Sequence, residues 1–284
     1  MPRAFWREPF LEMAEKVWTV AEERWIDDSP RTEDTVILEK YAVAHSPIDT
    51  VNFRADMLAK WREKGSGVDL KVRELPGRTR VVFLGTEEQW SQIPWAFWAR
   101  IFQAIEHPIG HTLIYADPRP RVDPDKNRSL TAADINGGFS YLGQREVIVL
   151  YRYEELTRVL LHELLHTAGF DSDKGVEQLE AYTEAWTEIF LCALLSRGRI
   201  NTFTRLWTEQ VNWMLEQAES LEVEYNVNTH LDYAWRYMKG KMEVLEGLGF
   251  LRGFIHKRLQ QPTTSLRFTT PTWDAEMYSK LPKP

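Results

Sequence analysis

The sequence has little of several features that mark out classes of protein. It has one cysteine, Cys192, in 284 residues, so an internal disulfide is excluded and a cysteine-based zinc site is disfavoured. No apolar run is long enough to span a bilayer. The N-terminal stretch MPRAFWREPFLEMAEK is charged throughout and lacks the apolar core of a secretory signal. We therefore expect a protein with no membrane partner, in the cytoplasm or elsewhere inside the cell.

Clusters of basic residues are also missing. The formal net charge is −7 and the isoelectric point is near 5.6. Because proteins hold a phosphate backbone with clustered lysine and arginine, we expect no nucleic-acid partner. What the chain does have is 43% hydrophobic residues, including 12% aromatic residues, which is enough for a sizeable core. Neither internal repeats nor low-complexity segments interrupt it.

The spacing of apolar residues predicts strands in the first half of the chain and helices throughout the second half. Because the two kinds of element do not alternate, this order favours an α+β fold, with an N-terminal mixed β-sheet and a backing helix. The tail from Gln261 is expected to lie extended on the surface. We expect one domain, 1–284, which a proline-rich loop at 117–134 could subdivide into 1–130 and 131–284. Helices are expected at 9–27, 50–63, 93–106, 154–170, 175–196, 200–221, 228–246 and 249–259. Strands are expected at 68–72, 81–84, 111–116, 139–142 and 146–151, and residues 35–44 fit either state.

The segment 154–170, EELTRVLLHELLHTAGF, contains His162, Glu163 and His166 in the spacing H-E-x-x-H. On a helix, residues four apart lie on one face, so the two imidazoles can bind one metal ion. Glu163 lies about 100° around the helix and can reach a water on that metal. The surrounding leucines predict a buried helix, and Gly169 is expected to end it. The segment indicates one zinc ion with Glu163 as general base, in preference to two core histidines without a metal.

A catalytic zinc site needs a third protein ligand. The predicted helix 175–196 carries glutamates at steps of three and four residues, and this row runs into Leu191 and Leu195. The later part of the row is therefore expected to be buried, where a carboxylate needs a partner such as zinc or a ligating histidine. The row consists of Glu177, Glu180, Glu184 and Glu188.

Together, the H-E-x-x-H helix and the segment 183–188, TEAWTE, resemble the gluzincin metallopeptidases, the thermolysin-like clan of zincins. The resemblance covers about residues 138–192. It implies a zincin-like fold with an active-site helix, and zinc-dependent hydrolysis of peptide bonds. It also implies Glu184 as the third ligand and Glu188 as an acid that orients a ligating histidine. Thr183 stands where the family usually has asparagine. Glu180 as ligand, with Glu184 behind it, remains an alternative.

A second resemblance competes with the first, because HELLHTAGF is similar to the start of the metzincin motif. The third metzincin ligand would fall at Ser172, which cannot serve, with Asp171 and Asp173 one residue away on either side. Some metzincins carry an insertion before this ligand, so the distant His230 could fill the role.

The resemblance to zincins implies a peptide or protein substrate that adds a strand to the sheet at 138–142 or 146–151. The oxyanion needs an electrophile besides zinc, and the side chains that could supply it are Tyr141, Tyr182, His230 and Tyr233. Two other functions remain open: a non-catalytic protein in which zinc holds two helices together, and hydrolysis of a non-peptide amide. Glu163 favours an enzyme, because a structural zinc site needs no base.

Overall fold

The computed structural model describes residues 7–43, 52–122, 128–170, 175–251 and 265–279. The chain forms two compact units. The first, which we call the sheet unit, comprises Glu23–Arg121 and Ala132–Phe170. The second, the helical unit, comprises Met1–Glu22, Val122–Thr131 and Asp171–Pro284. This division differs from a subdivision at residue 130, because the H-E-x-x-H segment belongs to the sheet unit and the first helix belongs to the helical unit.

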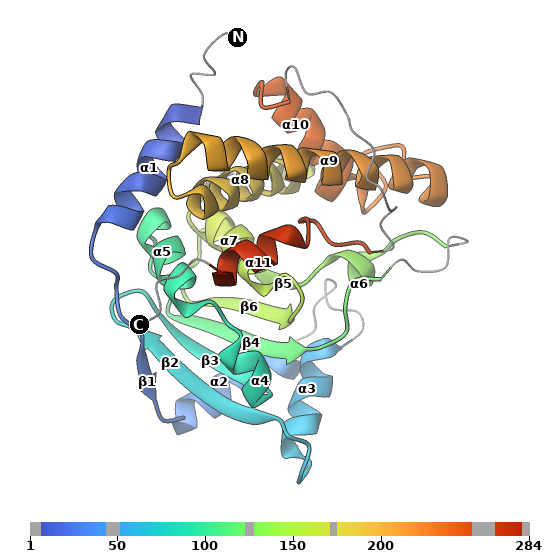
Figure 1. Ribbon diagram of the computed structural model, residues 1–284. Helices are drawn as coiled ribbons and strands as arrows, with labels where there is room; N and C mark the ends of the chain where they lie inside the picture. Colours follow the sequence, from blue (N-terminus) through green and yellow to red (C-terminus); the bar gives the residue numbers. More distant parts are fainter. Residues whose placement is uncertain (1–6, 44–51, 123–127, 171–174, 252–264, 280–284) are drawn as a thin grey trace. The chain divides into compact units, whose positions relative to one another are not determined.

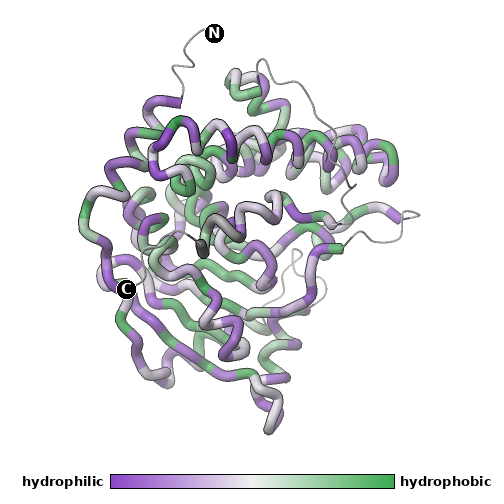
Figure 2. The backbone as a smooth tube through the Cα atoms, in the orientation of Figure 1, coloured by the Kyte–Doolittle hydropathy of each residue, from purple (hydrophilic) through white to green (hydrophobic). Residues whose placement is uncertain are grey.

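The sheet unit contains a six-stranded mixed sheet with the strand order β1-β2-β3-β4-β6-β5 (Figure 1). The strands β1, β2 and β3 are antiparallel neighbours, β3, β4 and β6 run parallel, and β5 forms one edge antiparallel to β6. Parallel strands are usually covered on both faces, and every residue of β3 and β6 is buried. Hydrophobic residues concentrate in these central strands (Figure 2). The strands are β1 (Ile26–Asp28), β2 (Asp69–Leu75), β3 (Thr79–Gly85), β4 (His111–Asp117), β5 (Gly138–Ser140) and β6 (Val147–Arg152).

Helices cover both faces of this sheet. On one face, Leu38 of α2 and Met57 of α3 join a buried cluster with Val82, Tyr115 and Val149 of the central strands. On the other face, α7 packs against β5 and β6, and α5 packs against α7 (Figure 1). The sheet is therefore the middle layer of three. The helices of this unit are α2 (Thr32–Val43), α3 (Phe53–Arg62), α4 (Glu87–Ser91), α5 (Trp95–Ile105), α6 (Ala132–Ile135) and α7 (Leu156–Thr167).

The helical unit is built around α8, which packs against α1, α9, α10, α11 and a π-helical turn, η2. Its last turns are apolar on all sides, and the residues from Ile189 to Leu195 are all buried. A helix that is hydrophobic all round belongs in a core. Among the described residues, no helix is long and apolar enough to cross a membrane. The elements are α1 (Glu8–Thr19), α8 (Val176–Ser196), α9 (Ile200–Tyr225), η2 (Arg236–Gly240), α10 (Lys241–Gly247) and α11 (Thr272–Ser279).

The α+β class with a mixed sheet is confirmed, but three local predictions are wrong. The helix predicted at 228–246 is one of them, since residues 228–234 form loop and turns before η2. Most of the helix predicted at 249–259 lies outside the described residues. The helix predicted at 9–27 ends at Thr19, and its last residues enter strand β1. The apolar spacing continued to Trp25, but this residue belongs to the sheet unit and not to the helical unit that contains α1. Its indole nitrogen donates to the Trp95 carbonyl at 2.7 Å. The tail is not extended on the surface either. Its residues form α11, with Trp273 fully buried.

Side chains of α9 explain where the tail lies. Three of them donate hydrogen bonds to tail carbonyls at 2.7–2.9 Å: Gln210 to Phe268, Trp213 to Arg267, and Gln217 to Ser265. These inward-facing polar groups satisfy backbone oxygens that burial would otherwise leave without a partner. The composition of the tail gives no sign of them.

Candidate metal centre

The helix α7 carries the H-E-x-x-H spacing, and all twelve of its residues are buried. Its end is set by Gly169, whose φ of +75° suits a residue without a side chain. The Phe170 amide donates to the Leu165 carbonyl at 3.1 Å, and the Gly169 amide donates to the His166 carbonyl at 3.2 Å. These two bonds form a Schellman motif. The predicted helix and its glycine stop are both confirmed.

His162 and His166 lie one turn apart on one face of α7. Their Nε2 atoms are 2.9 Å apart and their rings meet edge to face, with centroids 4.5 Å apart. Both side chains are buried. Two nitrogens bound to one tetrahedral zinc, at Zn–N distances of about 2.05 Å, lie about 3.3 Å apart. The two Nε2 atoms would have to move apart by only a few tenths of an ångström to bind one zinc ion, so the pair fits a shared metal.

Glu163 is also buried, and its carboxylate is held by the sheet. The hydroxyl of Ser140, the last residue of β5, donates to Glu163 Oε2 at 2.7 Å. The same hydroxyl lies 3.3 Å from the Glu163 backbone carbonyl oxygen. Sequence reasoning missed Ser140, since a serine at the end of a short strand matches no motif. Its place on β5, next to α7, is a property of the fold.

Tyr141, one of the side chains considered for the oxyanion, follows Ser140 directly. It is exposed, and its ring packs edge-on against Phe139 with centroids 6.0 Å apart. Ser172, with its two aspartate neighbours Asp171 and Asp173, lies outside the described residues.

The carboxylate row of α8 lies in the helical unit. Glu184 and Glu188 are fully buried, and Glu180 is half-buried. The prediction that the later part of the row is buried is therefore confirmed. A partner that the sequence did not indicate is Lys241, the first residue of α10. Its ammonium donates to Glu188 Oε1 at 2.8 Å and lies 3.8 Å from Glu184 Oε2.

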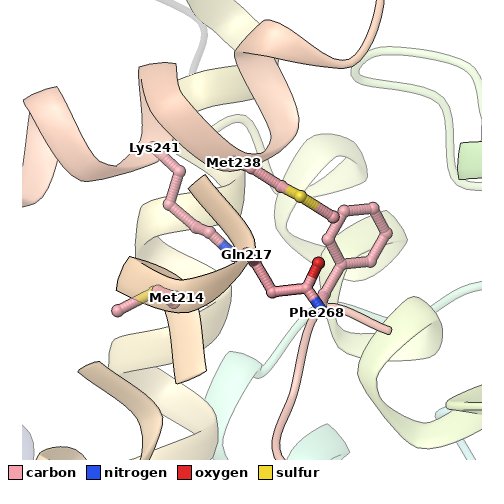
Figure 3. Close-up of a pocket in the computed structure, with 5 residues that line it drawn as sticks. All are labelled: Met214, Gln217, Met238, Lys241 and Phe268. Carbon is pink, nitrogen blue, oxygen red and sulfur yellow. The ribbon is translucent and has the colours of Figure 1, made fainter. Parts of the chain in front are cut away.

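Lys241 is itself only 1% exposed. Its ammonium lies 5.4 Å from the centre of the Phe268 ring, a distance typical of a cation–π contact. Lys241 also borders a small pocket (Figure 3). The other residues that line this pocket are Met214, Gln217, Met238 and Phe268. The lysine is therefore enclosed by apolar groups and by the glutamates it neutralises.

A pair of tyrosines lies near the same row. The hydroxyls of Tyr233 and Tyr237 are 3.2 Å apart. Burial, and then the negative charge of Glu180, raise the pKa of the Tyr237 hydroxyl well above its ordinary value. The hydroxyl therefore stays protonated and can donate a hydrogen bond. Tyr237 was not singled out from the sequence. It lies in η2, and π-helical turns of this kind often occur at functional sites.

The remaining predicted residues are less enclosed. Tyr182 is half-buried on α8, and His230 is exposed in the turn before η2, with its ring centroid 6.5 Å from that of Trp235. No protein-family model matches this chain, and no curated protein or solved structure matches it significantly.

Proposed function

We propose that this chain is a zinc-dependent metallopeptidase with a zincin-like architecture. The proposal depends on one observation in the sheet unit. Two buried imidazoles meet at 2.9 Å on α7, and the carboxylate of the intervening Glu163 is held by a hydrogen bond from Ser140. A structural zinc site requires no acid between its histidines, whereas a hydrolase requires a base of this kind.

Zinc would be held by His162, His166 and one carboxylate of α8. Two histidines and a glutamate leave a fourth position for water, as in other catalytic zinc sites. The family resemblance points to Glu184, but the charge of Lys241 beside that carboxylate opposes the approach of a second cation. Glu180 lies one turn before Glu184 on α8 and is half-buried. We therefore propose Glu180 as the ligand and Glu184 as the carboxylate behind it.

Zinc in such a site supplies a water of lowered pKa and polarises the substrate carbonyl. Glu163 accepts the proton of the attacking water on its carboxylate and passes it to the leaving amine. Among the described residues β5 is an edge strand of the sheet, and an extended peptide could bind there by strand addition. A hydroxyl donor for the oxyanion would come from Tyr233 or its neighbour Tyr237.

The test uses the full chain and its Glu163→Gln variant, with zinc content and cleavage of a peptide library measured on both. We expect one zinc per chain in each, and cleavage that falls at least about 100-fold in the variant. One zinc per chain without any cleavage by the unaltered protein would contradict the peptidase and favour a structural zinc. Absence of zinc binding would contradict both functions.

The third ligand is tested with two matched variants, Glu180→Gln and Glu184→Gln, in competition with a chelator. We expect Glu180→Gln to weaken zinc binding far more than Glu184→Gln does. The opposite order would restore the assignment implied by the gluzincin resemblance. Equal, small effects would mean that α8 supplies no ligand.

A further inference from the structure

The last residue of the edge strand β5 contacts the proposed base. We propose that Ser140 is a positioning residue that fixes the carboxylate of Glu163 in its working orientation. This inference depends on the proposed function of Glu163 as general base. The observation behind it is the 2.7 Å hydrogen bond from Ser140 Oγ to Glu163 Oε2, between two side chains of the sheet unit.

The contact follows from matched repeats on the strand and the helix. Gly138 and Ser140 are two apart, so they face the same side of β5 and are separated by about 6.8 Å. Val159 and Glu163 are four apart, so they face the same side of α7 and are separated by about 6 Å. Gly138 meets Val159, and one step further along Ser140 meets Glu163. The two elements are therefore in register over this distance.

Glycine at position 138 makes the close approach of strand and helix possible. A Cβ atom there would lie 2.8 Å from Val159 Cγ1 and 2.8 Å from the Val149 carbonyl oxygen. Distances this short force the neighbours to shift, so a side chain at position 138 would disturb the packing of β5 against both β6 and α7. With glycine at position 138, β5 lies close enough to α7 for Ser140, the next side chain on the helix-facing side of the strand, to reach Glu163, one turn beyond Val159.

The hydrogen bond has a definite consequence for the base. A carboxylate that accepts a bond at Oε2 loses its freedom to rotate about the terminal torsion, and this sets the direction in which Oε1 points. Reaction rates depend steeply on such geometry, and a displacement of about 1 Å can lower the rate about 100-fold. Ser140 acts through Glu163 and need not touch the substrate.

The experiment compares Ser140→Ala with Ser140→Thr, which retains the hydroxyl. Ser91→Ala is the matched control, because the Ser91 hydroxyl is exposed and, among the described residues, bonds within its own helix, at Glu88 O. We expect kcat to fall about 10- to 100-fold in Ser140→Ala, with KM and zinc content unchanged. Ser140→Thr should stay within a few-fold of the unaltered protein, and Ser91→Ala should match it.

A second readout does not need activity. Crystal structures of the metal-free protein and of metal-free Ser140→Ala should show the Glu163 carboxylate turned or spread over several orientations in the variant. An unmoved carboxylate, together with an unchanged kcat, would overturn the inference. If the unaltered protein binds no zinc and cleaves no peptide, the proposed function has failed. The crystal structures would then still decide whether Ser140 orients Glu163.

Discussion

Two buried helices, α7 in the sheet unit and α8 in the helical unit, carry polar groups amid leucines, and each supports these groups in a different way. On α7 the groups are two imidazoles, which can be neutral, and a carboxylate that takes a hydrogen bond from a hydroxyl. On α8 two carboxylates face a full positive charge, the Lys241 ammonium. Burial of an ion is costly, and the two carboxylates of α8 have a buried ammonium as counter-ion, whereas the Glu163 carboxylate is held by a neutral hydroxyl.

This difference predicts that α8 contributes mainly to the stability of the fold and α7 mainly to metal binding and catalysis. Removing a partner on α8 should reduce the stability of the fold, because it leaves uncompensated buried charge. Removing a partner on α7 should affect metal binding and catalysis more than folding, since the Ser140 hydroxyl lost there is a neutral group and not a buried counter-ion. The following experiments test this contrast, beginning with the largest expected effect.

Lys241→Met should destabilise the helical unit by about 3–5 kcal/mol, since Glu188 and Glu184 would lose a buried cation. Urea unfolding measures the free energy. The matched control is Lys239→Met, a lysine of η2 whose 2.7 Å pair with Glu222 lies at the surface. That pair should contribute less than about 1 kcal/mol. Equal losses in the two variants would contradict the contrast between the helices.

Zinc should stabilise the protein through α7. At a free zinc concentration about 1,000 times the dissociation constant, the free energy of unfolding should rise by about 4 kcal/mol. His166→Ala should abolish this gain, because one ligand of the proposed site is lost. Thermal unfolding with and without zinc measures the effect. A zinc-dependent gain that persists undiminished in His166→Ala would place the metal elsewhere.

An ion pair in the sheet unit should make stability depend on pH. Burial opposes ionisation of Asp34, but hydrogen bonds from Arg80 at 2.7 Å outweigh it and lower the pKa of Asp34. The contribution is therefore present above the unfolded pKa, near 3.9, and is lost as pH falls through the folded pKa. Asp34→Asn should cost about 2 kcal/mol at pH 7. The difference from the unaltered protein should shrink towards pH 3 in urea unfolding.

Tyr233→Phe should have the smallest effect on stability. It removes a 3.2 Å hydroxyl contact with Tyr237, which corresponds to about 1 kcal/mol. Steady-state kinetics then decides the role of the tyrosine. If Tyr233 stabilises the oxyanion, kcat falls while KM holds. A loss of stability alone, with kcat unchanged, would remove Tyr233 from the proposed mechanism.

Much of the candidate site could be predicted, because the residues that define it lie within a few positions of one another in the sequence. The H-E-x-x-H spacing predicts a shared face for His162 and His166, and Gly169 predicts the end of the helix. Both are geometric consequences of a 3.6-residue turn and of a residue without a Cβ atom. The apolar end of the glutamate row likewise predicted that Glu188 is buried.

The errors and omissions arose where a contact joins residues distant in sequence. Trp25 has helical spacing with Trp18, yet it hydrogen-bonds to the Trp95 carbonyl, 70 residues away. The tail looks extended from its threonines and prolines, yet it forms a helix that buries Trp273. Propensity and spacing describe a segment by itself, and the core that receives the segment overrides them.

The sequence by itself determined the buried helix α7, its paired imidazoles with an acid between them, and the mixed α+β character of the chain. The reason is that backbone periodicity and side-chain type act within a few residues of one another. Tertiary structure alone decided that Ser140 holds Glu163 and that Lys241 neutralises Glu188, across 23 and 53 residues of chain respectively. Such partners are selected by packing and by the high cost of burying a charge without a counter-ion, neither of which leaves a pattern in the sequence.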